Sequence, residues 1–436
     1  MTGVATLGRD FVTIGQAAEI LNVTEQTLRN WDRLGKLVAR RHPINGYRLY
    51  RVGDLHRMLR SVERDTSEPI SQIAINFDQA EILVEERSDS GSHGLDAELG
   101  ALPPCHWSAT VALDPKHRPQ DWNRPSSTVR RDWRKYPQEA HVLGPEHDRY
   151  RRLTVEEIAL LQGFDPAVVT GLDLTDRQRI AGIGDAVPPP LARTLLRAID
   201  ASWEWQDRST VEICDGTGGL AEGAAAIGLS HKALVERSSH CEPLLKNNRS
   251  WEPSAVAIDD VRSHDFKKYG RIGLLSGGPP CQPWSASGRR RGSLDERDLL
   301  GHLPELVNDL GPEVFLFENV PGLLSESNAA YLDDLVRRLR NPGPSHRYGV
   351  VAGVLNAADF GVPQLRRRVF LLGFRDAPSS LASTCFNRVE AMRTHRDPKL
   401  PGAKRLPWIT VGDILSRRQD LGGWRRWIGV TGLSGS

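Results

Sequence analysis

The stretch RIGLLSGGPPCQPWSASG (residues 271–288) holds one cysteine in a stiff loop directly after a hydrophobic run. Residues 272–275 predict a buried strand. Proline fixes its own φ angle and pushes the preceding residue away from the helical region, so we expect an extended loop around Cys281. Open α/β sheets bind their ligands at the carboxyl ends of the strands. The stretch therefore predicts a reactive thiol at that edge of a sheet.

Further apolar runs alternate with segments of helical pattern. The runs that predict strands are VEIC, KALVE, VFLFE, YGVVAGVL and RVFLLGF, at residues 211–214, 232–236, 314–318, 348–355 and 368–374. Helical patterns lie between several of them, at residues 219–228 and 329–339. Alternating strands and helices predict a Rossmann-like, doubly wound and mostly parallel α/β sheet.

The segment EICDGTGG (residues 212–219) places glycines between a strand and a helix. Glycine lets a ligand approach the backbone closely, and a helix start offers unpaired N–H groups. A purely structural turn explains the glycines equally well. Glu236 lies about 20 residues further on, at the end of the next strand, where a carboxylate can accept hydrogen bonds from ribose hydroxyls. Asp260 and Val261, after a third strand, are expected to meet an adenine edge.

Two polar groups follow the later strands. Glu318 ends the apolar run VFLFE and supplies the acid that a nucleophilic Cys281 needs, although helix capping is another role for it. Gln364, Arg366 and Arg368 alternate, so we expect them to share one face of a strand. Two guanidinium groups on one face suit a phosphate or a base carbonyl, and the alternative is a pair of solvated surface arginines.

Residues 11–59 form a separate unit. FVTIGQAAEILNVTEQTLRNWDRLGKL (residues 11–37) predicts two short helices, and Asn45-Gly46 predicts a hairpin turn after them. This unit resembles the DNA-binding domain of the MerR regulators. The resemblance implies a winged helix-turn-helix domain over residues 9–64, and a small interaction domain without a DNA role is the alternative.

The same resemblance implies which residues touch DNA. The second helix would enter the major groove, and the wing would contact phosphate. The residues implied for these contacts are Gln26, Arg29, Asn30 and Arg48. A second basic patch, which includes Arg289 and Arg290, follows the cysteine loop and also suits a polyanion, although either patch alone fits an ordinary solvated surface.

Composition argues against several other classes of protein. The 436 residues carry 57 Lys and Arg against 55 Asp and Glu, and this net charge of +2 says little about partners. The 5 cysteines have no CxxC spacing, so neither a disulfide framework nor a zinc site is indicated. No apolar run approaches a membrane span, and the start lacks the layout of a signal peptide. We therefore expect a cytoplasmic, nucleoid-associated protein that contacts no membrane.

Three segments, together with the cysteine loop, resemble the DNA cytosine-5 methyltransferases. They are FENVPGL (317–323), LNAADFGVPQLRRRVFLLG (355–373) and the helix pair RRLTVEEIALLQGF…IGDAVPP (151–164 and 183–189). The resemblance implies methyl transfer from S-adenosylmethionine to carbon 5 of cytosine in double-stranded DNA. It also implies bacterial DNA modification or defence as the setting, and it requires no metal.

The resemblance further assigns roles to individual residues. Cys281 would add to carbon 6 of a cytosine flipped out of the duplex, and Glu318 would hold and protonate ring nitrogen 3. Arg366 would contact the base carbonyl or the backbone nearby. The supporting residues would be Arg368, Gln364 and Thr128. The residues implied to border the methyl donor are Cys214, Asp215, Gly216, Gly218, Glu236, Arg237, Asp260, Val261, Pro280, Leu300, Asp185 and Ala186.

The order of the segments departs from the family. Residues 121–200 carry segments that usually close the chain, so the resemblance implies a circular permutation, which is tolerable where chain ends lie close together. Asp185 stands where the family usually has asparagine, Cys214 where it has an aromatic residue, and Gly273 where an acid is common. Two of these positions would border the cofactor.

Five regions follow from these patterns. They are the winged helix-turn-helix domain (9–64), a linker or variable region (65–120), the permuted C-terminal motifs (121–200), the Rossmann-like catalytic core (209–375) and a tail with a reduced target-recognition region (376–436). We hypothesise that residues 11–59 help to choose the target, and a second polypeptide that supplies recognition is the competing explanation. The alternative functions are a DNA-binding regulator with an inactive or partner-dependent methyltransferase fold and an RNA cytosine methyltransferase.

Overall fold

The structure of the chain is a computed structural model. The described residues are 11–14, 17, 28, 31–32, 37–41, 48–51, 53–55, 108–109, 119–131, 140–147, 149–280, 299–399 and 405–416. They divide into an N-terminal unit within residues 1–89 and a larger unit that holds most of residues 90–436. The predictions that fall outside the described residues concern Gln26, Arg29, Asn30, Cys281, Arg289 and Arg290.

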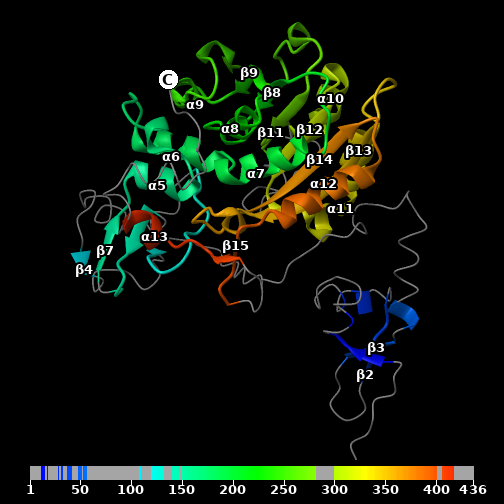
Figure 1. The fold of residues 1–436 in the computed structure, drawn as a ribbon, viewed down its shortest axis with the longest axis horizontal. Helices are drawn as coiled ribbons and strands as arrows, with labels where there is room; N and C mark the ends of the chain where they lie inside the picture. The colour runs from blue at the N-terminus through cyan, green and yellow to red at the C-terminus, as the bar shows by residue number, and fades with distance from the viewer. Residues whose placement is uncertain are drawn as a thin grey trace, which may run out of the picture. The chain divides into compact units, whose positions relative to one another are not determined.

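The larger unit is built on a 7-stranded sheet in the order β10-β9-β8-β11-β12-β14-β13 (Figure 1). The strands are β8 (Ser209–Ile213), β9 (Ser230–Glu236), β10 (Val256–Ile258), β11 (Leu274–Gly277), β12 (Val314–Asn319), β13 (Tyr348–Asn356) and β14 (Arg367–Arg375). Strands β10, β9, β8, β11 and β12 run parallel, and β14 pairs antiparallel with β12. The predicted Rossmann-like sheet is confirmed.

Helices cover this sheet because its central strands are apolar on both faces. The helices are α7 (Pro189–Asp200), α8 (Gly219–Ala226), α9 (Cys241–Asn247), α10 (Leu303–Leu310), α11 (Ala329–Arg340) and α12 (Ser379–Ala391). Val314 and Leu316 of β12 join a core that includes side chains of α7, α8 and α12. Phe315 and Phe317 alternate with them and stack with ring centroids 5.2 Å apart, so they lie on the opposite face. Short 3₁₀ helices occur at residues 166–168, 253–255, 267–269, 300–302, 321–324, 326–328 and 357–360.

A second core joins residues 140–186 to the tail. Its elements are the sheet β4-β7-β6-β5, with β4 (Ser108–Ala109), β5 (Gln120–Asp121), β6 (His141–Leu143) and β7 (Arg149–Arg152), and the helices α5 (Val155–Gln162), α6 (Asp176–Asp185) and α13 (Val411–Leu415). Helix α5 begins with a capping box: Thr154 Oγ1 accepts from Glu157 N at 3.2 Å, and Glu157 Oε2 accepts from Thr154 N at 3.0 Å. A short parallel pair, β15 (His395–Arg396) and β16 (Leu406–Pro407), precedes α13.

The segment IAGIGDAV is helical as far as Asp185, because Thr175 caps α6 and Gly182 and Gly184 permit close packing. One local prediction needs correction. The set Gln364, Arg366 and Arg368 does not share one strand. Strand β14 begins at Arg367, so the first two residues lie in the loop before it.

The N-terminal unit contains a small antiparallel sheet in the order β1-β3-β2, with β1 (Phe11–Thr13), β2 (Arg40–Arg41) and β3 (Arg48–Arg51). Its buried core is formed by Ala17, Leu28, Leu37, Tyr50 and Leu55. Arg48, predicted to contact phosphate, has its Nε 2.8 Å from Asp32 Oδ2 within the unit. The DNA contacts of this unit stay a prediction. Among the described residues of the whole chain, no helix is long and apolar enough to cross a membrane.

Candidate active site

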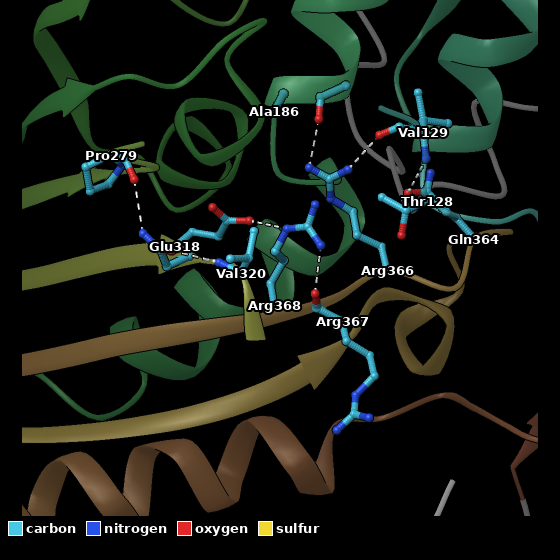
Figure 2. Close-up of polar contacts among 12 residues, drawn as sticks. Thr128, Val129, Ala186, Pro279, Glu318, Val320, Gln364, Arg366, Arg367 and Arg368 are labelled. Carbon is cyan, nitrogen blue, oxygen red and sulfur yellow. Dashed lines mark hydrogen bonds and ion pairs between the residues drawn. The ribbon is translucent and has the colours of Figure 1, made fainter. Parts of the chain in front are cut away.

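The carboxyl end of β12 carries a buried ion pair. Glu318, the predicted acid, is 8% exposed, and its Oε1 lies 2.7 Å from Arg368 Nε (Figure 2). Arg368 also donates from Nη1 to the carbonyl oxygen of Arg367 at 2.7 Å, which fixes its guanidinium. An arginine held on a carboxylate in this way keeps that carboxylate in one orientation at the edge of the sheet.

The loop that leads to Cys281 lies beside this pair. A Cβ built on Gly278 would be 3.3 Å from Glu318 Oε2, so the backbone after β11 runs directly past the acid. Asn319 Nδ2 donates to the carbonyl oxygen of Pro279 at 3.0 Å and ties the loop to the end of β12. Pro280 is the last described residue before Cys281, whose side chain lies outside the described residues.

Arg366 is enclosed by the backbone of a segment remote in sequence. It is 2% exposed, and it donates from Nη1 to the carbonyl oxygen of Val129 at 3.0 Å and from Nη2 to that of Gly184 at 2.9 Å. Burial lowers the pKa of its guanidinium to about 9. An arginine enclosed by backbone carbonyls joins segments of the protein together. These hydrogen bonds agree with the predicted contact of Arg366 with the backbone nearby, and its contact with a base carbonyl stays a prediction.

Gln364 and Thr128 join the same two regions. Gln364 Oε1 accepts from Val129 N at 3.2 Å, and its Nε2 donates to Gln162 Oε1 at 2.7 Å. Thr128 Oγ1 donates to the carbonyl oxygen of Leu365 at 2.9 Å. Residues 128–186 are thus bound to the loop before β14, although more than 170 residues separate them along the chain. The supporting role predicted for both side chains fits these contacts.

A cavity of about 600 Å³ opens along the carboxyl ends of β10, β9, β8 and β11. The sequence-predicted cofactor residues that line it are Asp185, Cys214, Glu236, Arg237, Asp260, Val261 and Pro280. The sequence did not indicate the other lining residues, which are Arg131, Ser238, Arg262, Gly278 and Leu299. Local pattern gave no signal for Arg131, because it reaches the cavity from a segment remote in sequence.

The glycine turn shapes one wall of the cavity. Gly216 has a φ of 59° and Gly218 a φ of 89°, in the left-handed region that favours glycine. Asp215 is 4% exposed, and its carboxylate accepts from the backbone N–H groups of Leu220 at 3.2 Å and Ala221 at 2.9 Å. Asp215 therefore caps α8, and it does not line the cavity. Gly216, Gly218, Ala186 and Leu300 are likewise absent from the described lining.

Charges in the cavity are held by specific partners. Glu236 accepts from Ser238 N at 2.8 Å through Oε1 and from Gly216 N at 3.4 Å through Oε2. Hydrogen bonds from Arg262 lower the pKa of Asp260 below its usual range. Burial raises the pKa of Asp185 to about 6, a shift opposed by the charge of Arg131. Apolar walls at Val261, Pro280 and Leu299 complete the site.

This set of groups fits a nucleoside with a charged substituent. Carboxylates at Glu236 and Asp260 can accept hydrogen bonds from hydroxyl and amino groups, and apolar walls can enclose a flat ring. The cavity reaches Gly278, which borders Glu318, so a substituent of the nucleoside can extend to the acid. The arrangement therefore suits group transfer from a nucleoside donor to an acceptor held at Glu318.

Comparisons with known proteins agree with this geometry. The family model described as C-5 cytosine-specific DNA methylase matches residues 53–201 and 208–417, and the MerR family regulatory protein model matches residues 13–50. The chain is 36% identical over 169 residues to the type II methyltransferase M.NgoMIV of Neisseria gonorrhoeae, covering 38% of this chain and 52% of that protein.

Two further relatives are similar over the same share of the chain. The type II methyltransferase M.AgeI of Thalassovita gelatinovora is 36% identical over 176 residues, covering 38% of this chain and 39% of that protein. The type II methyltransferase M.AquIA of Picosynechococcus sp. is 32% identical over 184 residues, covering 39% and 73%. The chain thus spans about half or less of the length of the first two of these relatives.

Proposed function

The chain belongs to the C-5 cytosine-specific DNA methylase family, and we propose that it transfers a methyl group from S-adenosylmethionine to carbon 5 of cytosine in DNA. One observation carries the proposal: the nucleoside-sized cavity runs to Gly278, where the backbone passes Glu318 on its way to Cys281. Donor, acid and thiol are thereby expected at one edge of one sheet. The setting we propose is restriction-modification, which the type II relatives support.

The chemistry assigns one task to each group. Bound in the cavity, S-adenosylmethionine supplies an electrophilic methyl group on a sulfonium. Cys281 would add as a thiolate to carbon 6 of cytosine, which makes carbon 5 nucleophilic. Glu318 would hold ring nitrogen 3 and give it a proton as charge develops. Carbon 5 would then take the methyl group from the sulfonium, which leaves as the neutral thioether S-adenosylhomocysteine. Loss of the carbon 5 proton to water and return of the nitrogen 3 proton to Glu318 would expel the thiolate and restore the ring.

The target base has to leave the duplex before Cys281 can reach it. Flipping a base out of the stack costs a few kcal/mol, which contacts in the site have to offset. Arg368 lies on Glu318, with its side chain 13% exposed, and we assign it the contact with the base carbonyl in place of Arg366. Arg366, Gln364 and Thr128 would then act as positioning residues that hold the loop before β14.

A circular permutation accounts for the order of the segments. Residues 121–200 precede the sheet in sequence, yet their backbone carbonyls at Val129 and Gly184 bind Arg366 beside the acid. The connection from α7 to β8 spans only residues 201–208. Glu313, 2% exposed, fixes it by accepting from Trp203 Nε1 at 2.9 Å and Asp207 N at 2.7 Å.

Target choice is the role we propose for the N-terminal unit. The match to the MerR model over residues 13–50 supports DNA as its ligand. Methylation mapping with and without residues 1–64 tests this role, because the full chain and the shortened chain should differ in rate or in site choice. Identical maps would leave recognition to the tail or to a second polypeptide.

Transfer of a tritiated methyl group into duplex DNA tests the proposed activity. The wild-type protein should label DNA at cytosine, Cys281→Ser should abolish labelling, and Glu318→Gln should reduce it strongly while the protein stays folded. Equal labelling by wild type and Cys281→Ser would remove the thiol from the mechanism. No labelling by the wild type would favour the regulator with an inactive or partner-dependent methyltransferase fold.

A further inference from the structure

The cavity has two ends that differ in chemistry. Glu236 and Asp260 follow β9 and β10 at the outer side of the sheet, whereas Gly278 and Pro280 follow β11 beside the acid Glu318. Asp185 lies over the turn after β8, between these ends: a Cβ built on Gly216 would be 3.2 Å from the Asp185 carbonyl carbon. The charge of Asp185 accordingly interacts with both Glu236 and Glu318.

Arg131 and Asp185 both line the cavity and form an ion pair. Its Nε lies 3.5 Å from Asp185 Oδ2, and their side chains are 53% and 31% exposed. The two other arginines of the lining lie at the end of the cavity that holds Asp260. Arg262 donates to both oxygens of Asp260, at 2.9 and 2.6 Å, and Arg237 lies 3.9 Å from Asp260. Among the arginines of the described lining, Arg131 is therefore the one that pairs with Asp185, whereas the other two pair with Asp260.

The segment that carries Arg131 does not depend on this ion pair for its position. Arg366 holds it through the Val129 carbonyl oxygen, and Gln364 holds it through the Val129 N–H group. Gly184 packs against its backbone so closely that a Cβ there would lie 2.5 Å from the Arg130 carbonyl carbon. The long, half-exposed pair adds little to a segment already fixed by its backbone.

We propose that Arg131 and Asp185 together bind the amino-acid end of the methyl donor. This inference rests on the proposed function. The donor carries a carboxylate and an ammonium on one carbon atom, and an arginine beside a carboxylate is complementary to both charges. Arg131 binds the ligand carboxylate and Asp185 binds the ligand ammonium. The pair thereby selects a nucleoside that carries an amino acid over one that lacks it.

Two ligands separate this role from binding of the nucleoside. S-adenosylhomocysteine carries the amino-acid end, and 5′-deoxy-5′-methylthioadenosine has the same nucleoside and thioether without it. Binding of both is measured by isothermal titration calorimetry on the full chain. Arg131→Gln should weaken S-adenosylhomocysteine about tenfold or more, as expected for loss of a charge-assisted hydrogen bond, and should leave methylthioadenosine within about twofold.

Matched variants give the controls. Arg130→Gln changes the neighbouring arginine, which does not line this cavity, and should bind both ligands as the wild type does. Asp185→Asn should also weaken S-adenosylhomocysteine selectively, because an amide carries no charge for the ammonium. Glu236→Gln should weaken both ligands alike, since both contain the ribose. Thermal melting confirms that each variant is folded.

Two results would overturn the inference. If Arg131→Gln weakens both ligands equally, or neither, while the wild type binds both, the pair has no role at the amino-acid end and the proposed function stands. If the wild type binds neither ligand, the cavity is not a site for the donor. That result removes the proposed function and this inference with it.

Discussion

Replacing Arg366 or Arg368 by methionine should have different effects: the first should mainly lower stability, and the second should mainly lower methyl transfer. Arg366 donates to two buried carbonyl oxygens, and Arg366→Met leaves both without these donors. An unsatisfied buried acceptor costs about 1–3 kcal/mol, so we expect the free energy of unfolding to fall by about 3 kcal/mol. Arg368→Met removes a partner of Glu318 at the site, so we expect a smaller loss of stability, about 1–2 kcal/mol, and a loss of methyl transfer of about 100-fold or more.

Urea denaturation followed by tryptophan fluorescence measures the first effect, and single-turnover methyl transfer by the folded protein measures the second. Calorimetric titration with S-adenosylhomocysteine serves as the control, since both variants should retain the donor cavity when folded. The assignment is refuted if Arg366→Met keeps wild-type stability and loses transfer, or if Arg368→Met transfers methyl groups at the wild-type rate. Either result would restore Arg366 as the residue that contacts the base.

Three further predictions test the fold around the site. Burial lowers the pKa of His231 from 6.5 to about 4, so the unfolded chain binds a proton at this residue more readily than the folded protein does. The stability that neutral His231 contributes is present above pH 6.5 and is lost as the pH falls to 4. At about 1.4 kcal/mol per pH unit, the wild type should lose about 3 kcal/mol more unfolding free energy than His231→Gln over that range, measured by urea denaturation. Glu313→Gln should lower the unfolding free energy by about 1–3 kcal/mol, because an amide cannot accept every hydrogen bond from residues 203–207. An unchanged midpoint of urea denaturation would refute the stabilising role of Glu313. Gly219→Ala should destabilise by about 3 kcal/mol or more, since its Cβ would overlap the carbonyl oxygen of Val187, and a normal melting temperature would contradict this packing.

Local sequence pattern predicted those helices and strands that are determined by residues close together in the chain. The capping box at Thr154 set the start of α5, and the apolar runs set the central strands to within two residues. Glu236 and Asp260 could be placed at the cavity because parallel strands end at the same edge of a sheet. In each case the physical cause acts within one element or between neighbouring strands.

The elements that pattern missed depend on contacts remote in sequence. Strand β6 has only three residues, HVL, and β7 reads RYRR, so β6 is too short and β7 too polar for either to be predicted from its own pattern. Alternation of Arg366 and Arg368 could not tell which one is enclosed, because the enclosing carbonyls come from Val129 and Gly184. Arg131 was missed for the same reason: its place at the cavity follows from how residues 119–131 pack.

The proposed permutation can preserve one active site because none of the contacts that hold the loop before β14 depends on chain connectivity. The tail returns to the same region, where the N–H groups of Val411 and Gly412 donate to the carbonyl oxygens of Arg124 and Trp122, each at 2.8 Å. Residues at opposite ends of the larger unit are therefore neighbours, as a chain cut and rejoined at other points requires. What the permuted order adds is the connection of residues 201–208, and Glu313 satisfies its backbone N–H groups at Gln206 and Asp207. A permuted chain should therefore depend on Glu313 for part of its stability, and relatives with the usual segment order should not.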